Sequence, residues 1–310
     1  MFFNLFRRKS NEEDTVNMQE DVKQIHETTK TKVSSEIPFE EKIIYLSEGK
    51  EKAFPRSFEK EKYFTVAKEI YESSDAKDVI NKIEITNLNG DAGHCLSKIK
   101  NNRLHTTIRI DSFKLGIVNH SGFVHEYSDE KCNVFTNILA HELVHAEDDK
   151  RIVDTFGIEE YEKIRNNTVA YFGKVILSEY TACRKTAQQY GDFESPENIE
   201  GTIAAHYRTL PNVSEKNLTN PETKDFVYAL RLNYAIATRC AFADVSQEKE
   251  EDLYISSNIK YHKEYAKYIL SVRNLLRTNY EKQPLNQEKY QKLGQQIMSE
   301  LATIYSMNDY

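Results

Sequence analysis

Two histidines and a glutamate lie close together in the segment Ala140-His141-Glu142-Leu143-Val144-His145. On an α-helix, four residues turn through about 400°, so His141 and His145 are expected about 40° apart on one face, where two imidazoles can bind one metal ion. Glu142 is expected beside them. A carboxylate there can take a proton from water that attacks a carbonyl and pass it to a leaving amine. The segment therefore predicts a metal-assisted hydrolytic site.

The residues around this segment favour a helix, because apolar side chains recur at steps of three and four. Two imidazoles beside such an apolar face are costly to bury unless they have a partner. A metal ion is a suitable partner. The apolar positions are Val134, Ile138, Leu139, Leu143 and Val144.

A third ligand is needed, because catalytic zinc sites usually combine three protein ligands with a water molecule. The best candidate is Glu179, which lies 34 positions after His145 in the segment Leu177-Ser178-Glu179-Tyr180-Thr181-Ala182. This segment is also predicted to be helical, and the small Ala182 one turn later allows a close approach to the first helix. The expected metal ligands are thus His141, His145 and Glu179.

The two segments resemble the HExxH helix and the E-x-x-A element of the gluzincin branch of the zincin metallopeptidases. The resemblance implies one catalytic Zn²⁺ held by His141, His145 and Glu179, with Glu142 as general base and a peptide or protein as substrate. It also implies a zincin fold, in which an edge strand before the HExxH helix lines the substrate cleft. Our candidate for that strand is 106–111, where an extended peptide would add backbone hydrogen bonds; an ordinary sheet strand is the alternative.

Three positions test which branch the chain resembles. Thermolysin-like gluzincins carry an aspartate four residues after the ligand glutamate, where this chain has Cys183. The third metzincin ligand falls at Arg151, which cannot bind zinc, so that branch is excluded. Asp149 matches the acidic or histidine position after HExxH in the regulatory ImmA/IrrE-like peptidases, in which E-x-x-A also recurs.

Other residues are candidates for supporting roles. Asp148 or Asp149 is placed to accept the imidazole N–H that faces away from the metal; the alternative, which we favour slightly, is a solvated acidic helix end beside Lys150 and Arg151. Arg184 is a candidate to tether the helix of Glu179 or to pair with these acids. A hydrolase of this type also needs a hydrogen-bond donor for the oxyanion, and the sequence leaves four candidates open. They are His206, Tyr207, Tyr180 and Tyr234.

A rival constellation lies upstream. The string Gly93-His94-Cys95-Leu96-Ser97 is similar to the GCLS motif that carries the cysteine ligand of peptide deformylases, which also use HExxH. On that reading Cys95 replaces Glu179, and the chain is a deformylase-like amidohydrolase. The histidine that interrupts the motif and the long helical second half of this chain count against it.

The elements that position these residues follow from periodicity. Alternating residues predict strands at 82–86 and 106–111, with a turn at Asn89-Gly90, whereas 38–78 favours short helices that include Ile43, Ile44 and Leu46. Helices are expected near 133–149, 159–190, 223–245, 259–280 and 286–306. The fold class is therefore α+β, a zincin-like small sheet followed by the active-site helix and a mainly helical C-terminal half. We expect a flexible polar tail at 1–37, a zincin-like catalytic domain at 38–195 and a helical subdomain at 196–310.

Composition excludes several classes of protein. The chain has 42 Lys and Arg against 49 Asp and Glu, a formal charge of −7, which argues against a nucleic-acid partner.

No apolar run is long enough to span a bilayer. At 1–9 the aromatic residues precede the cations, which is the reverse of the order in a signal peptide. We therefore expect a cytoplasmic protein with at most weak peripheral membrane contact through 1–9. Two further hypotheses remain: a non-catalytic zinc protein whose C-terminal helices bind a protein partner, and a regulatory peptidase with one protein substrate.

Overall fold

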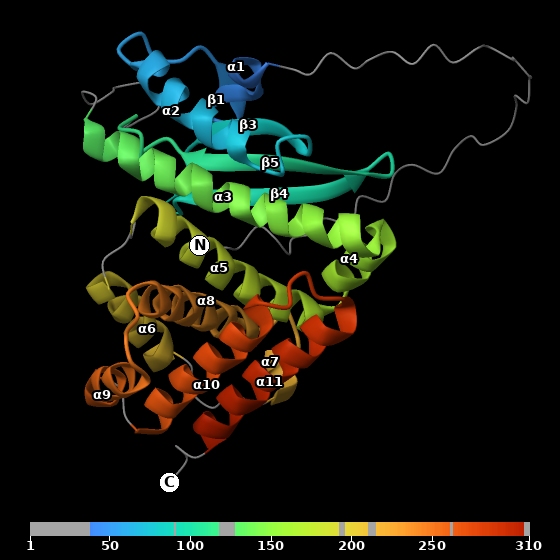
Figure 1. Cartoon of the computed structure of the whole chain (residues 1–310), viewed down its shortest axis with the longest axis vertical. Helices are drawn as coiled ribbons and strands as arrows, with labels where there is room; N and C mark the ends of the chain where they lie inside the picture. The colour runs from blue at the N-terminus through green and yellow to red at the C-terminus, as the bar shows by residue number, and fades with distance from the viewer. Residues whose placement is uncertain are drawn as a thin grey trace, which may run out of the picture.

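The computed structural model describes residues 38–89, 91–117, 128–191, 196–209, 215–260 and 263–306. It confirms the α+β class: a five-stranded mixed sheet is followed by a mostly helical half. Figure 1 shows the sheet and α2 at one end of the molecule, the C-terminal helices at the other, and α3 and α5 between them. The expected tail, the expected membrane contact at 1–9 and Gly90 lie outside the described residues.

The sheet is built from the first part of the chain, which also holds two helices. The strand order is β2-β1-β3-β5-β4; β1 is parallel to β3 and β3 to β5, whereas β2 and β4 run antiparallel to their neighbours. The elements are α1 (Phe39–Lys42), β1 (Ile43–Ser47), β2 (Lys50–Lys52), α2 (Lys60–Ser73), β3 (Ile80–Thr86), β4 (Gly93–Lys100) and β5 (Arg103–Asp111).

Two sequence-based expectations are wrong in this region. The strand at 106–111 is not an edge strand, because β5 lies between β3 and β4; the edge beside the HExxH helix is β4. Residues Ile43–Ser47 form a strand rather than a helix, because β1 pairs with both β2 and β3. In both cases the pairing of strands, with a hairpin neighbour on one side and β3 on the other, decides the outcome, and the local pattern of apolar residues does not specify it.

One face of the sheet is apolar and packs on helices. Ile83, Ile85, Ile108 and Ile110 are fully buried in a cluster with side chains of α2 and of the first half of α3. The residues between them face the other way, where Arg109 donates a 2.7 Å hydrogen bond to Glu84. This alternation is the period of two expected for a strand that is buried on one side.

The helical part begins with the long HExxH helix. Ser128 caps its first turn by accepting a hydrogen bond from the Lys131 amide, and Gly157, with φ of 85°, ends it. The predicted single helix at 159–190 is two helices, because Asn167 leaves helical geometry and caps the second. The predicted helix at 259–280 likewise begins later, at Lys263. The elements are α3 (Asp129–Phe156), α4 (Ile158–Asn166), α5 (Thr168–Tyr190), α6 (Pro196–Thr209), α7 (Glu215–Leu218), α8 (Lys224–Val245), α9 (Glu250–Lys260), α10 (Lys263–Tyr280) and α11 (Gln287–Ser306).

Helix α5 is the centre of the second hydrophobic cluster, which it shares with α8, α10 and α11. It approaches α11 most closely at Gly173 and Gly294, where a side chain on either residue would overlap backbone atoms of the other helix. α5 also packs along α3 (Figure 1). The predicted domain boundary at residue 195 stays a prediction. Among the described residues, no helix is long and apolar enough to cross a membrane.

Candidate metal centre

Three side chains from α3 and α5 converge on one point. The Nε2 atoms of His141 and His145 are 3.0 Å apart, and Glu179 Oε2 lies 3.3 Å from each of them. In a tetrahedral zinc site with ligands at 2.0–2.1 Å, two ligand atoms are about 3.3 Å apart. The triangle therefore has the dimensions of three ligands around one metal ion. Among the described residues, it is the one group of three or more potential ligands with atoms within 4.8 Å of one another.

Burial makes this arrangement costly without a cation. Glu179 is only 1% exposed, and its Oε2 has no hydrogen-bond partner in the structure. Burial raises the pKa of Glu179, but the charge of His141, and then that of His145, outweigh that effect and hold the pKa well below its ordinary range. The carboxylate is thus ionised, and a metal ion is the partner that fits this donor set. The side chain of His145 remains 14% exposed and links the centre to solvent.

The second nitrogen of His145 is fixed through a serine. Ser178 Oγ donates a 2.8 Å hydrogen bond to Asp148, so it accepts from His145 Nδ1–H, 2.9 Å away. This tautomer leaves the Nε2 lone pair facing the other two ligands. Asp148 also pairs with Arg151. Asp148, one of the two acids expected to accept a histidine N–H, therefore interacts with His145 through Ser178 and not directly.

Asp149 has a different role. It lies 2.6 Å from Lys174 Nζ and accepts a 3.2 Å hydrogen bond from the Tyr161 hydroxyl. Burial raises the pKa of Asp149, and the Lys174 charge and hydrogen bonds reverse the shift, so that its pKa is below the ordinary value. Asp149 therefore ties α3 to α4 and α5 rather than contacting a predicted ligand.

The other oxygen of Glu179 is held by two further residues. Thr238 on α8 donates to Oε1 at 3.0 Å, and Cys183 Sγ donates to the same atom at 3.1 Å. Cys183 occupies the position at which the resemblance expected an acid that orients a histidine; here the side chain orients the glutamate itself. No local pattern points to Thr238, because it lies on another helix, 59 residues after Glu179.

Glu142 lies between the histidines and strand β4. It is buried, and a Cβ atom at Gly93 would come within 2.6 Å of its Oε1, so the glycine makes room for the carboxylate. Burial raises the pKa of Glu142; the charges of His141 and His145 reduce the shift without cancelling it. A carboxylate with a raised pKa is a better base than one in water.

The remaining candidates are separated by the structure. Cys95 points from β4 towards the sheet core, is absent from the ligand group, and burial raises the pKa of its thiol well above the ordinary value. The Tyr180 hydroxyl donates to Asp244, away from the centre. Burial, and then the charges of Glu179 and Glu142, raise the pKa of Tyr234 well above its ordinary value, so this candidate lies near the two carboxylates.

Two candidates have no shown link to the centre. His206 lies on α6, where burial and then the charge of Arg231 lower its pKa, and the side chain of Tyr207 is outside the described residues.

Arg184 stacks on the Tyr280 ring at 4.4 Å and donates to the Tyr180 hydroxyl, so it does tether α5, but not to the acids.

No protein-family model, curated protein or solved structure matches this chain. The interpretation of the centre therefore rests on its own geometry and chemistry.

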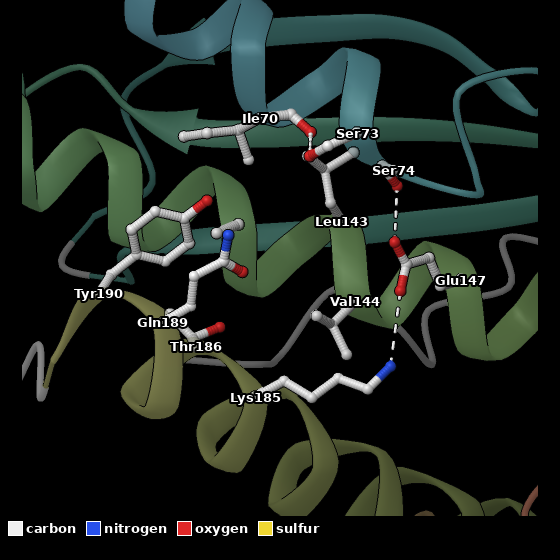
Figure 2. A pocket seen from close by; sticks show the side chains of 11 residues that line it. Ile70, Ser73, Ser74, Leu143, Val144, Glu147, Lys185, Thr186, Gln189 and Tyr190 are labelled. Carbon is white, nitrogen blue, oxygen red and sulfur yellow. Dashed lines mark hydrogen bonds and ion pairs between the residues drawn. The ribbon is translucent and has the colours of Figure 1, made fainter.

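A separate cavity of about 130 Å³ lies between α2, α3 and α5. Figure 2 shows Glu147 on its wall, where the carboxylate accepts a 2.8 Å hydrogen bond from Ser74 and pairs with Lys185 at 3.6 Å. None of the three predicted ligands lines this cavity. Glu147 therefore joins α2 to α5 across α3, and the cavity is distinct from the metal centre.

Proposed function

We propose that this protein is a zinc-dependent metallopeptidase of the zincin type. The observation that carries the proposal is the triangle of His141 Nε2, His145 Nε2 and Glu179 Oε2, with the buried Glu142 carboxylate beside it. Two imidazoles and a carboxylate are a common ligand set of catalytic zinc. A structural zinc site usually has four protein ligands, and the group among the described residues has three.

The reaction assigns separate work to the metal and to the chain. Zinc, when bound, is a Lewis acid that polarises a carbonyl and makes water a stronger nucleophile at neutral pH. Glu142 takes the proton from the attacking water and then donates it to the leaving amine. Its burial and raised pKa suit both steps, because the group must gain a proton and lose it near neutral pH. Ser178 and Asp148 keep His145 in the tautomer that binds through Nε2.

The edge strand supports a peptide substrate. Because the Asp111 amide donates to the Ala92 carbonyl, and residues alternate along an antiparallel ladder, the backbone groups of Gly93, Cys95 and Ser97 point away from the sheet. Arg165 donates a 2.9 Å hydrogen bond to the outward Ser97 carbonyl. The stretch around Gly93 and Cys95, beside Glu142, is therefore the part of the edge to which an extended peptide would bind. An edge strand that precedes the HExxH helix and lines the substrate cleft is also what the zincin resemblance implies.

The first experiment measures zinc per chain by elemental analysis, on protein purified without chelators, for the wild type and Glu179→Ala. We expect about one zinc in the wild type and a large loss in the variant. A wild type without zinc contradicts the proposal. A variant with full zinc removes Glu179 as a ligand and favours Cys95 or a non-catalytic site.

The second experiment separates metal binding from catalysis. Glu142→Gln should keep the zinc and lose hydrolysis of a mixture of unstructured peptides followed by mass spectrometry, because the amide cannot accept the proton. Hydrolysis at the wild-type rate would remove Glu142 as general base. Zinc binding without hydrolysis in the wild type would favour the non-catalytic partner-binding hypothesis or a peptidase restricted to one protein substrate.

A further inference from the structure

The centre is enclosed by three helices, and each contributes a pair of residues four positions apart. Helix α3 supplies His141 and His145, and α5 supplies Glu179 and Cys183. Helix α8, from the C-terminal half, supplies Thr238, whose hydroxyl donates to Glu179, and Tyr234, whose pKa is raised by burial and then by the charge of Glu179. Residues four apart on a helix share a face, so α8 presents one polar pair to the carboxylate.

The Thr238 hydroxyl has one proton and two acceptors within reach. Glu179 Oε1 is 3.0 Å away, and the Tyr234 carbonyl of its own helix is 3.1 Å away. A hydrogen bond to an ionised carboxylate is about twice as strong as one to a neutral carbonyl, so the Thr238 hydroxyl donates to Glu179 rather than to the carbonyl. Thr238 is buried, so the loss of this hydrogen bond would leave the carboxylate oxygen with one donor fewer and no ready replacement from water, which costs free energy.

The consequence for Glu179 is a fixed orientation. With Oε1 held by Thr238 and by Cys183, the carboxylate cannot rotate freely, and Oε2 stays directed at the two histidines. Ligands held by outer hydrogen bonds bind metal more tightly, because less freedom is lost on binding.

We infer that Thr238 is a positioning residue for the metal centre, and that α8 thereby makes the C-terminal half a part of that centre. This inference rests on the proposed zinc site. Helix α8 is also anchored to α10. Near its end, Asp244 accepts hydrogen bonds from Arg273 at 2.7 Å and from Arg277 at 2.8 Å. The orientation of Glu179 thus depends on how the C-terminal helices are docked.

The test is zinc affinity, measured by competition with a chromophoric chelator, for the wild type, Thr238→Val and Thr238→Ser. The valine is close in shape and lacks the hydroxyl; the serine restores it. We expect Thr238→Val to bind zinc about 10–100-fold more weakly and Thr238→Ser to recover most of the affinity. Thr238→Ala provides the same comparison if the valine variant does not fold.

Thr186→Val is the matched control. Thr186 is a buried threonine on α5 whose hydroxyl has no hydrogen-bond partner in the structure, so its removal should leave zinc affinity unchanged. Circular dichroism of the metal-free variants checks that each is folded, and the Co²⁺ absorption spectrum of each reports the ligand geometry directly.

The outcomes are distinct. Equal zinc affinity in folded wild type and Thr238→Val overturns the role of Thr238 and leaves the proposed function standing. Equal losses in Thr238→Val and Thr186→Val mean a general packing effect and also overturn it. A wild type that binds no zinc removes the proposed function and this inference together.

Discussion

Replacement of Gly93 by alanine should separate catalysis from metal binding. Gly93 is in β4 and is not among the described glycines with positive φ, so alanine can adopt its backbone conformation. Its new Cβ would lie 2.6 Å from Glu142 Oε1 and 2.9 Å from Ile138 Cγ2. Both contacts are too short, so both side chains must shift: the flexible end of Glu142 moves readily, whereas the core residue Ile138 gives way at a cost in stability.

The magnitude follows from these distances. Ordinary van der Waals contact begins near 3.4 Å, so Glu142 Oε1 has to shift by about 0.8 Å. A misplacement of about 1 Å in a catalytic group can reduce the rate about 100-fold, equivalent to about 2.7 kcal/mol in the activation free energy. None of the three predicted ligands supplies an atom among the three nearest to the new methyl group, so we expect the zinc content not to change.

The assay compares kcat/KM for a peptide that the wild type cleaves, zinc per chain and the melting temperature, for Gly93→Ala and for Gly201→Ala. Gly201 is an exposed helical glycine with open space where its Cβ would lie, so its variant should match the wild type in kcat/KM and zinc content and melt at the same or a slightly higher temperature, because alanine favours the helix. A Gly93→Ala protein with full zinc and wild-type kcat/KM would refute the placement of Glu142 as base.

Three further substitutions test the surrounding structure. Asp244→Asn should lower the free energy of unfolding by about 3–5 kcal/mol in urea denaturation, because the fully buried Arg273 loses its carboxylate. Burial raises the pKa of Asp244, but hydrogen bonds from two arginines and a tyrosine outweigh this effect, so the folded-state pKa lies below the ordinary 3.8. The contribution of ionised Asp244 to the free energy of unfolding is therefore complete above pH 3.8 and is lost as the pH falls towards the folded-state pKa. The Asp244→Asn variant should lack this acid dependence. Gly294→Ala should lower the free energy of unfolding by about 1–3 kcal/mol, because its Cβ would overlap the Val169 carbonyl oxygen; unchanged thermal unfolding would contradict that contact. Ser178→Ala should weaken zinc binding about 10–100-fold in chelator competition, since the histidine loses the group that fixes its tautomer; wild-type affinity would show that the serine is dispensable.

The part of the centre that could be predicted is the part that a single helix determines. The spacing of His141 and His145 places them on one face of any α-helix, and the apolar periodicity around them predicts that helix. Residue type and the family resemblance predict Glu179 as the third ligand, and the structure places its carboxylate beside both histidines. Its role as a ligand, like that of Glu142 as base, stays a prediction.

Features that depend on tertiary structure could not be predicted from the sequence. β4 carries few apolar residues, because an edge strand needs to match only one neighbour, so the periodicity of Gly93–Lys100 is weak and its place at the edge was assigned to 106–111. The break at Asn167 was missed because a capping asparagine resembles any other polar residue in a helical pattern. Thr238 had no signal at all, since its partner is on another helix.

The place of α5 among later helices also sets an order of events during synthesis. The chain emerges from the ribosome N-terminus first, at about 5–20 residues per second, so the Thr238 hydroxyl appears about 3–12 s after Glu179, its partner 59 residues earlier. The α11 residues that cover α5 at Gly173 come later still, close to the end of the described chain. Until then α5 lacks the hydrophobic neighbours that α11 supplies. The arrangement around Glu179 is therefore complete only after the α11 residues have been made, and a nascent chain released before that point would carry the HExxH helix without all the helices that pack around α5.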